Sequence, residues 1–326
     1  MRLAVISDIH VLGPGEHEFD RDLFTELGAQ RHWARATWRR VLHRVRRRFW
    51  NWHPEFRRAC FLRALEEIEA YHPDWVVANG DYGGDTHGVG LSDEATYESA
   101  AGVITLMREI FSDRSHFIFG DHDIGKYSTG KRQGGIRLAS LDLGEQRLGI
   151  RSFWHEQTED FDLIGINSSL ITLDYFLPEA LTEEIPEWQR RREQHEQLVL
   201  ETFEQLPKSA RVVLFCHDPS ALGILIHNPV VQSRLEQVEL TVLGHLHEPR
   251  LLTLMQRLPQ LPSWRPRYPV ARIITEGIRN AHARAAFKPI VCPSPFGAGH
   301  HISGGVLFIE KDAHGRLMTR RHRIKL

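Results

Sequence analysis

The chain has 326 residues, with 41 Lys and Arg against 42 Asp and Glu, and its formal net charge is −1. This balance argues against a uniformly basic nucleic-acid-binding protein and against an acidic disordered one. A hydrophobic content of 41% is enough for a sizeable core. No apolar run reaches the length of about 18 residues that a membrane-spanning helix needs.

The N-terminus and the cysteine pattern both bear on the cellular compartment. The first apolar run, 3–6, leads directly into polar residues, so it lacks the cleavable apolar stretch of a signal peptide. The cysteines, Cys60, Cys216 and Cys292, lie far apart with no CxxC spacing. That spacing argues against a disulfide framework and against a thiolate zinc site. We therefore expect a cytoplasmic protein, with peripheral association on the inner face of the membrane left open.

In chain order, short apolar runs of strand length alternate with segments of helical periodicity. The runs are 3–6, 75–78, 116–119, 161–166, 212–215 and 240–243. Several show no alternation of apolar and polar residues, which is typical of strands covered on both faces. Helical periodicity lies between them, for example in 61–68 and 103–110. This alternation predicts an α/β fold, and the last residues, about 303–326, have the pattern of a β-hairpin.

Five of these runs are followed directly by Asp and His. The residues are Asp8 and His10, then Asp81, then Asp121 with His122 and Asp123, then His217, and finally His245 with His247. Open α/β sheets place their sites at the carboxyl ends of strands. Carboxylate and imidazole groups are ligands for Mn, Fe, Zn and Co. One such block can arise by chance, but five in succession indicate a shared metal centre.

In order, the blocks read D-x-H, G-D, G-D-H-D, H and G-H-x-H, a set that resembles the motifs of the calcineurin-like metallophosphoesterase family. The resemblance implies a four-layer α-β-β-α fold, in which two mixed sheets pack face to face between helices. It also implies two metal sites that share Asp81 as a bridging ligand. One site would take Asp8, His10, Asp81 and His247, and the other would take Asp81, Asp121, His217 and His245.

The same resemblance implies that His122 contacts the phosphate and assists the leaving group, with Asp123 orienting His122. Two divalent ions can clamp a phosphoryl group and acidify a shared water. A metal-bridged hydroxide would then attack a phosphodiester or pyrophosphate bond while His122 protonates the departing oxygen. We expect two divalent ions, with Mn ahead of Fe, Zn and Co.

One position departs from the family pattern, because the family has Asn where this chain has Asp121. The extra negative charge predicts tighter binding of the second metal but a weaker Lewis acid and a less acidic bridging water. Natural variation, a preference for a more highly charged ion and an inactivating change all remain open as explanations.

The stretch between Asp8 and Asp81 is too long for a simple crossover, so it predicts an insertion at about 20–55 within a single domain, 1–326. Residues 31–58 carry ten Arg and a single acidic residue. An apolar stripe surrounded by Arg predicts a basic amphipathic helix here. For 31–53 we consider a helix lying on the core, a surface for an anionic membrane or lipid substrate, and, less favoured, a nucleic-acid contact.

A second basic group follows the His122 motif in a glycine-containing loop. It consists of Lys126, Lys131, Arg132 and Arg137. Its position close to the expected metals suggests contacts to a second phosphate of the substrate. An exposed loop with solvated charges is the alternative.

Together these features predict a binuclear metal-dependent phosphoester hydrolase. If the basic helix meets a membrane, the substrate could be a lipid-linked nucleotide such as UDP-2,3-diacylglucosamine, whose pyrophosphate some members of the family cleave. The alternatives are a catalytically weakened scaffold or regulatory protein on the same fold, and a nuclease or cyclic-nucleotide phosphodiesterase.

Overall fold

Strand β1 (Arg2–Ile6) lies at the centre of the first of two sheets, and every residue after Arg2 in it is buried. The computed structural model describes residues 1–16, 54–125, 134–245, 285–297 and 304–326. The first sheet has the order β10-β9-β1-β2-β3. Its other strands are β2 (Trp75–Ala78), β3 (Ser115–Phe117), β9 (Gly305–Lys311) and β10 (Leu317–Arg323). Strands β1, β2 and β3 run parallel, whereas β9 is antiparallel to both of its neighbours.

The second sheet also has five strands, in the order β4-β5-β6-β7-β8. They are β4 (Phe153–Gln157), β5 (Asp162–Ile166), β6 (Val212–Cys216), β7 (Val238–Leu243) and β8 (Pro289–Val291). Strands β5 to β8 are parallel, and only the edge strand β4 is antiparallel to its neighbour. Both sheets are therefore mixed, with their parallel strands grouped together.

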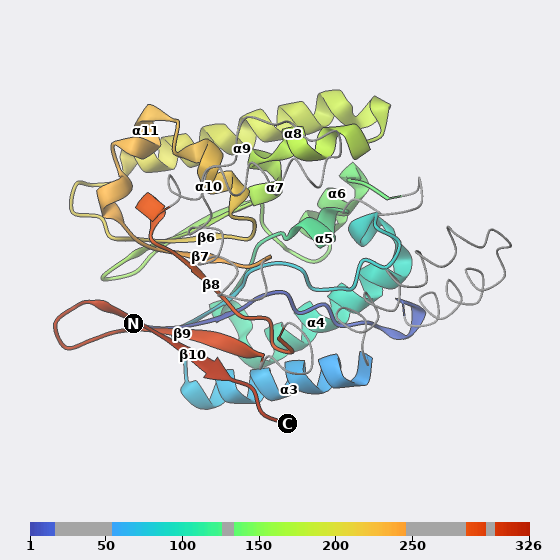
Figure 1. The fold of residues 1–326 in the computed structure, drawn as a ribbon, viewed down its shortest axis with the longest axis horizontal. Helices are drawn as coiled ribbons and strands as arrows, with labels where there is room; N and C mark the ends of the chain where they lie inside the picture. The colour runs from blue at the N-terminus through green and yellow to red at the C-terminus, as the bar shows by residue number, and fades with distance from the viewer. Residues whose placement is uncertain (17–53, 126–133, 246–284, 298–303) are drawn as a thin grey trace, which may run out of the picture.

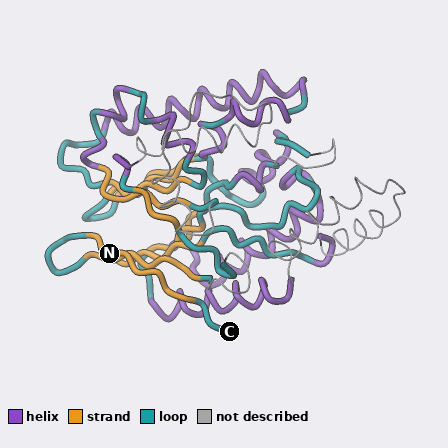
Figure 2. The backbone as a smooth tube through the Cα atoms, viewed as in Figure 1, coloured by secondary structure: helices purple, strands orange, loops and turns teal. Residues whose placement is uncertain are grey.

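Helices cover the outer face of each sheet (Figures 1 and 2). The described residues include the α-helices α3 (Pro54–Tyr71), α4 (Glu94–Phe111), α5 (Asp121–Ile124), α6 (Leu138–Gln146), α7 (Ser168–Ile171), α8 (Leu173–Phe176), α9 (Ile185–Gln205), α10 (Ser220–Leu225) and α11 (Pro229–Gln232). Figure 1 shows α3 and α4 on one side of the two sheets, and α9, α10 and α11 on the opposite side. Helix α4 begins at a side-chain cap, since the carboxylate of Asp93 accepts a hydrogen bond from the backbone N–H of Thr96.

Three clusters of buried apolar side chains fill the spaces between these layers. Val5 of β1 and Val213 of β6 belong to the cluster between the sheets. The neighbouring residue Ile6 faces the other way and joins the cluster with the side chains of α3 and α4. Leu214 joins the cluster under α9 and α10. Adjacent residues of one strand thus enter different layers, as expected where both faces of a sheet are covered.

This arrangement confirms the expected α/β fold with two mixed sheets between helices. Two short strands, β4 and β8, were not expected from the sequence, and β7 begins earlier than the apolar run 240–243. At the C-terminus, β9 and β10 pair in antiparallel register from Gly305 with Arg323 to Lys311 with Leu317. Most of the expected insertion at about 20–55, including 31–53, lies outside the described residues.

Two further sequence features can be compared with the structure. The three cysteines are buried and form no disulfide. Within the described ranges, the structure contains no helix long and apolar enough to cross a membrane.

Helix α9 carries a buried histidine that links stability to pH. Burial of His195 lowers the pKa of its imidazole to about 4, so the neutral form is favoured in the folded protein. The unfolded chain then binds more protons than the folded one between about pH 4 and pH 6.5. Stability from this residue is present above pH ~6.5 and is lost as pH falls toward 4.

We predict that His195→Leu flattens the acid side of the stability profile of the metal-free protein. The parent should lose about 3 kcal/mol of unfolding free energy through His195 between pH 6.5 and 4, and the variant should not. Urea unfolding at several pH values in a chelating buffer measures this difference. His227→Leu, at an exposed position, should keep the parental slope. Equal slopes for parent and His195→Leu would contradict the prediction.

Candidate metal centre

The structure brings the Asp and His residues that follow five strands to one place. Asp8 and His10 follow β1, Asp81 follows β2, Asp121 and His122 begin α5 after β3, His217 follows β6, and His245 follows β7. Three groups of potential ligand atoms form there, each with its atoms within 4.8 Å of one another. The groups are His10 with Asp81 and His122, Asp121 with His217 and His245, and Asp8 with Asp81 and His217.

Asp81 and Asp121 are the carboxylates around which the imidazoles gather. Oδ2 of Asp81 lies 3.1 Å from Nε2 of His217 and 3.5 Å from Nε2 of His10. Oδ1 of Asp121 lies 3.3 Å from Nε2 of His217 and 2.9 Å from Nδ1 of His245. Asp81 therefore stands between the two halves of the site, where the sequence predicted a shared ligand.

The far nitrogens of two imidazoles are fixed by backbone carbonyls. Nδ1 of His217 lies 2.6 Å from the carbonyl oxygen of Asn79, and Nδ1 of His10 lies 3.1 Å from that of Gly83. A carbonyl can only accept a hydrogen bond, so each Nδ1 carries the proton and donates it. Each Nε2 then faces the carboxylates with its lone pair available to a metal ion.

The backbone is unusual at four of the proposed ligands. Asp8, His10, Asp81 and His245 have φ values of 54°, 42°, 61° and 57°. Left-handed backbone is uncommon for residues other than glycine, and such strain concentrates at functional sites. The surrounding hydrogen bonds must therefore hold these turns in place.

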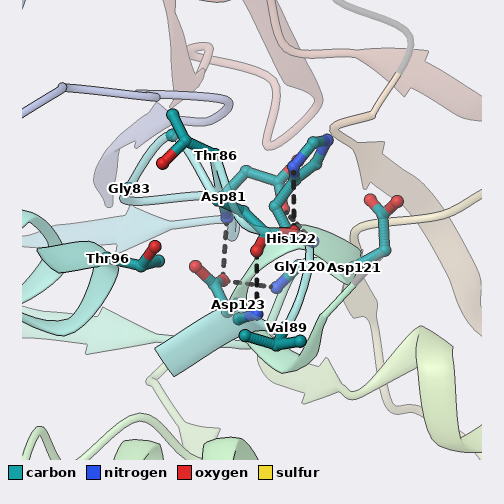
Figure 3. A network of polar contacts seen from close by, with 12 residues as sticks. Asp81, Gly83, Thr86, Val89, Thr96, Gly120, Asp121, His122 and Asp123 are labelled. Atoms are coloured by element: carbon teal, nitrogen blue, oxygen red, sulfur yellow. Dashed lines mark hydrogen bonds and ion pairs between the residues drawn. The ribbon is translucent and has the colours of Figure 1, made fainter. Parts of the chain in front are cut away.

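Asp123 holds two of the ligand-bearing turns together (Figure 3). Its carboxylate accepts hydrogen bonds from the backbone N–H groups of Asp81, Tyr82 and Gly120, at 2.8 to 3.0 Å. Burial, with the nearby charge of Asp81, raises the pKa of Asp123 to about 7. The turns after β2 and β3 are thus joined through one buried side chain.

A different carboxylate lies beside His122. Oδ2 of Asp85 is 3.6 Å from Nδ1 of His122, and Oδ1 of Asp85 accepts a hydrogen bond from the backbone N–H of Gly90 at 2.8 Å. The carboxylate of Asp123 accepts hydrogen bonds from backbone N–H groups, and its expected role in orienting His122 stays a prediction. The sequence offered a signal for Asp85, which stands four residues after Asp81 in the same loop, but sequence reasoning passed over it.

The charge of the centre suits bound cations. Asp8, Asp81 and Asp121 are each no more than 1% exposed, and burial raises the pKa of Asp8. Burial alone would lower the pKa of His217, but Asp81 and Asp121 raise it well above its ordinary value. Buried carboxylates this close together need a positive counter-charge. Oδ2 of Asp81 and Nε2 of His217 lie 3.1 Å apart, and within the described residues neither has a hydrogen-bond partner outside the cluster of proposed ligands, so both face the place where a metal ion would bind.

Comparison with known proteins places this geometry in a family. The family model described as calcineurin-like phosphoesterase matches residues 1–249. The chain belongs to that family. It is therefore a metallophosphoesterase, and the family implies a centre of two metal ions at the clusters described above.

One solved structure shows a shared fold at low sequence identity. A dimetal phosphatase from Danio rerio matches with a TM-score of 0.53 and 12% identity, over 100% of this chain and 96% of that one. A sulfate thiohydrolase from Thermus thermophilus matches with a TM-score of 0.41 and 13% identity, over 99% of this chain and 56% of that one. A search of curated protein sequences gives no significant match.

Some of the predicted site residues of this phosphoesterase lie outside the described residues, namely His247, Lys126, Lys131 and Arg132. Arg137 is described, and its guanidinium donates hydrogen bonds to the carbonyls of Gly134, Ile136 and Glu179. These contacts hold its own loop against the segment that contains Glu179.

We predict that Gly120→Ala disrupts the metal centre. A Cβ at this position would lie 2.1 Å from Oδ1 of Asp81 and 2.6 Å from its backbone nitrogen, too close for either group to stay in place. Overpacking of this kind should lower the unfolding free energy by about 1–3 kcal/mol and reduce Mn²⁺ binding.

Gly102 provides the matched control. It lies within α4 and a Cβ there would meet nothing within 4 Å. Gly102→Ala should raise the unfolding free energy by about 1 kcal/mol and leave Mn²⁺ binding unchanged. Thermal unfolding and metal analysis of both variants make the comparison. A Gly120→Ala protein with parental stability and metal content would show that the close approach is not required.

Proposed function

We propose that this metallophosphoesterase hydrolyses a phosphodiester or pyrophosphate bond at a centre of two divalent metal ions. The observation that supports this is the convergence of three buried carboxylates with imidazoles from separate strands. Asp8, His10, Asp81 and His247 would hold one ion. Asp81, Asp121, His217 and His245 would hold the other, as the family pattern and the distances around Asp81 and Asp121 suggest.

We place Mn²⁺ first because the three carboxylates of the proposed ligand set suit a hard ion, although the four imidazoles also suit Fe, Zn and Co. When bound, the two ions would polarise the phosphoryl oxygens and make a water nucleophilic at neutral pH. The protein supplies the ligand geometry and the buried carboxylates around them.

His122 has the right placement to act on the leaving group. Its side chain is 12% exposed, whereas those of His10 and His217 are no more than 2% exposed, so it stands at the outer edge of the centre. Its ring centroid is 4.8 Å from that of His10. With Nδ1 beside Asp85, Nε2 is the nitrogen that would donate a proton to the departing oxygen.

The substrate class is proposed from the basic segments of the sequence. The ten arginines of 31–58 would suit an anionic membrane surface or a lipid-linked nucleotide such as UDP-2,3-diacylglucosamine, met at the cytoplasmic face of a membrane. Lys126, Lys131, Arg132 and Arg137 would add contacts to a second phosphate. A nuclease is less favoured, because the basic segment is short compared with a groove along nucleic acid.

Hydrolysis of bis-p-nitrophenyl phosphate tests the reaction. The metal-stripped protein should be inactive, and addition of Mn²⁺ should restore turnover. His122→Ala should keep its Mn²⁺ content but lose about 100-fold or more in kcat on a phosphodiester with an alkoxide leaving group, the usual contribution of a positioned general acid, and lose less on bis-p-nitrophenyl phosphate, whose leaving group departs without a proton. Full metal occupancy with no hydrolysis of any phosphoester would instead favour a scaffold or regulatory protein.

The proposed lipid-linked substrate is tested by comparing substrates in vesicles with soluble substrates. UDP-2,3-diacylglucosamine in anionic vesicles should be hydrolysed faster than soluble nucleotides, phosphomonoesters and cyclic nucleotides. Deletion of 31–53 should abolish sedimentation with the vesicles and this preference, while hydrolysis of bis-p-nitrophenyl phosphate continues. Unchanged sedimentation after the deletion would rule out a membrane role for the segment.

Asp121 gives a prediction of its own. Asp121→Asn removes one negative charge next to His217 and His245, so we expect Mn²⁺ binding at that half of the centre to weaken about 10-fold. With one negatively charged ligand fewer, the two ions would be less neutralised by the protein. They should then be stronger Lewis acids, so kcat should rise. Calorimetric titration with Mn²⁺ and turnover of bis-p-nitrophenyl phosphate measure both. Equal values for parent and variant would show that Asp121 does not tune the centre.

A further inference from the structure

The turn that carries Asp8 and His10 is held by groups far away in the sequence. Both residues have left-handed backbone, with φ values of 54° and 42°. Their N–H groups donate to the carbonyls of Gly80 and Asp81, at 3.1 and 3.0 Å. These bonds attach the N–H groups of the turn to the loop after β2. The carbonyl oxygens of Asp8 and His10 bond to other groups.

Two side chains hold those carbonyl oxygens. Oγ of Ser294 donates a hydrogen bond to the carbonyl of Asp8 at 2.8 Å, although 286 residues separate the two. Nη1 of Arg57 donates to the carbonyl of His10 at 3.1 Å. Both partners are buried, with Ser294 at 0% and Arg57 at 4% exposure, so water does not compete freely for these bonds.

Arg57 also contacts the segment that contains Ser294. The guanidinium of Arg57 lies over the ring of Phe296, 4.6 Å from its centroid, and that ring lies 6.4 Å from the ring of His10. Phe296 stands two residues after Ser294, in the segment that follows β8. The first turn of α3 and this segment therefore hold the turn from two directions.

The burial of the Arg57 guanidinium also needs a physical explanation. A buried guanidinium is retained only where it makes good hydrogen bonds or meets negative charge. Here it bonds to the backbone of a residue whose imidazole is 3.5 Å from the Asp81 carboxylate. The buried guanidinium is therefore joined directly to the backbone of a proposed metal ligand.

We propose that Arg57 and Ser294 are positioning residues of the metal centre. They hold the Asp8–His10 turn in the left-handed conformation that aims both ligand side chains at Asp81. The inference rests on the proposed two-metal function, and it makes that centre asymmetric. Loss of either side chain weakens the metal site that contains Asp8 and His10, and spares the site that contains Asp121, His217 and His245.

Titration of the metal-stripped protein with Mn²⁺, followed by calorimetry and by equilibrium dialysis, tests this asymmetry. The parent should bind two ions. Arg57→Gln and Ser294→Ala should each weaken one of the two sites by about 10- to 100-fold and leave the other within about 2-fold. Arg57→Lys should recover part of the loss, because an ammonium group keeps the charge and one donor.

Two matched variants separate positioning from general stability. Arg108 also donates to one carbonyl, that of Leu148, and lies over an aromatic ring, that of Phe117, but at a more exposed position. Thr241 is fully buried and its hydroxyl donates to the carbonyl of Phe287 at 2.8 Å. Arg108→Gln and Thr241→Val remove the same kinds of bond where the acceptor is not a metal ligand, so both should bind two Mn²⁺ ions as the parent does.

The possible results distinguish a failure of the two-metal function from a failure of the positioning role of Arg57 and Ser294. A parent that binds fewer than two Mn²⁺ ions overturns the two-metal function and this inference with it. A parent with two sites overturns the inference alone if Arg57→Gln and Ser294→Ala bind Mn²⁺ like the controls, or if both sites weaken equally. Thermal unfolding in a chelating buffer shows whether each variant is folded. If Arg57→Gln is not, Ser294→Ala and Arg57→Lys decide the question.

Discussion

The constraint on which the site depends is the burial of negative charge. Asp8, Asp81 and Asp121 are almost completely shielded from water, and two of them lie within 3.5 Å of imidazole nitrogens. Without compensation, such a group of carboxylates would take up protons or destabilise the fold. Bound cations would supply the compensation, and the hydrogen bonds that hold the surrounding backbone keep the carboxylates close enough to share them.

Close approach of the backbone makes this concentration of charge possible. Gly120 fits against Asp81 where a Cβ would come within 2.1 Å of its Oδ1, and Asp123 then joins the turns after β2 and β3 through three backbone N–H groups. The turn after β2 also carries Asp81 in the strained, left-handed conformation. The stability of the packed sheets below the site supports this strain, which the turns could not sustain alone.

The sequence predicted the α/β fold, and it predicted the Asp and His residues that the structure brings together after the strands; their role as metal ligands stays a prediction. Apolar runs followed by Asp or His predict where parallel strands end, and ends of parallel strands meet at one edge of a sheet. Strands β4 and β8 were not predicted from the sequence. Strand β4 is only partly buried, and β8 has three residues and begins at a proline. Asp85, Arg57 and Ser294 could not be assigned, since their roles arise from contacts across the fold and not from a local pattern.

The charges of the centre without metal also affect how it would bind metal ions. His217 lies within 3.3 Å of both Asp81 and Asp121, and these carboxylates raise its pKa well above the ordinary value. A proton on Nε2 of His217 therefore occupies the position that a metal ion needs. Metal and proton compete for one nitrogen, and the extra charge of Asp121, compared with asparagine, strengthens the hold on both. We therefore expect the departure from the family pattern to alter the affinity of the centre for cations in general, and its effect on catalysis to follow from that affinity.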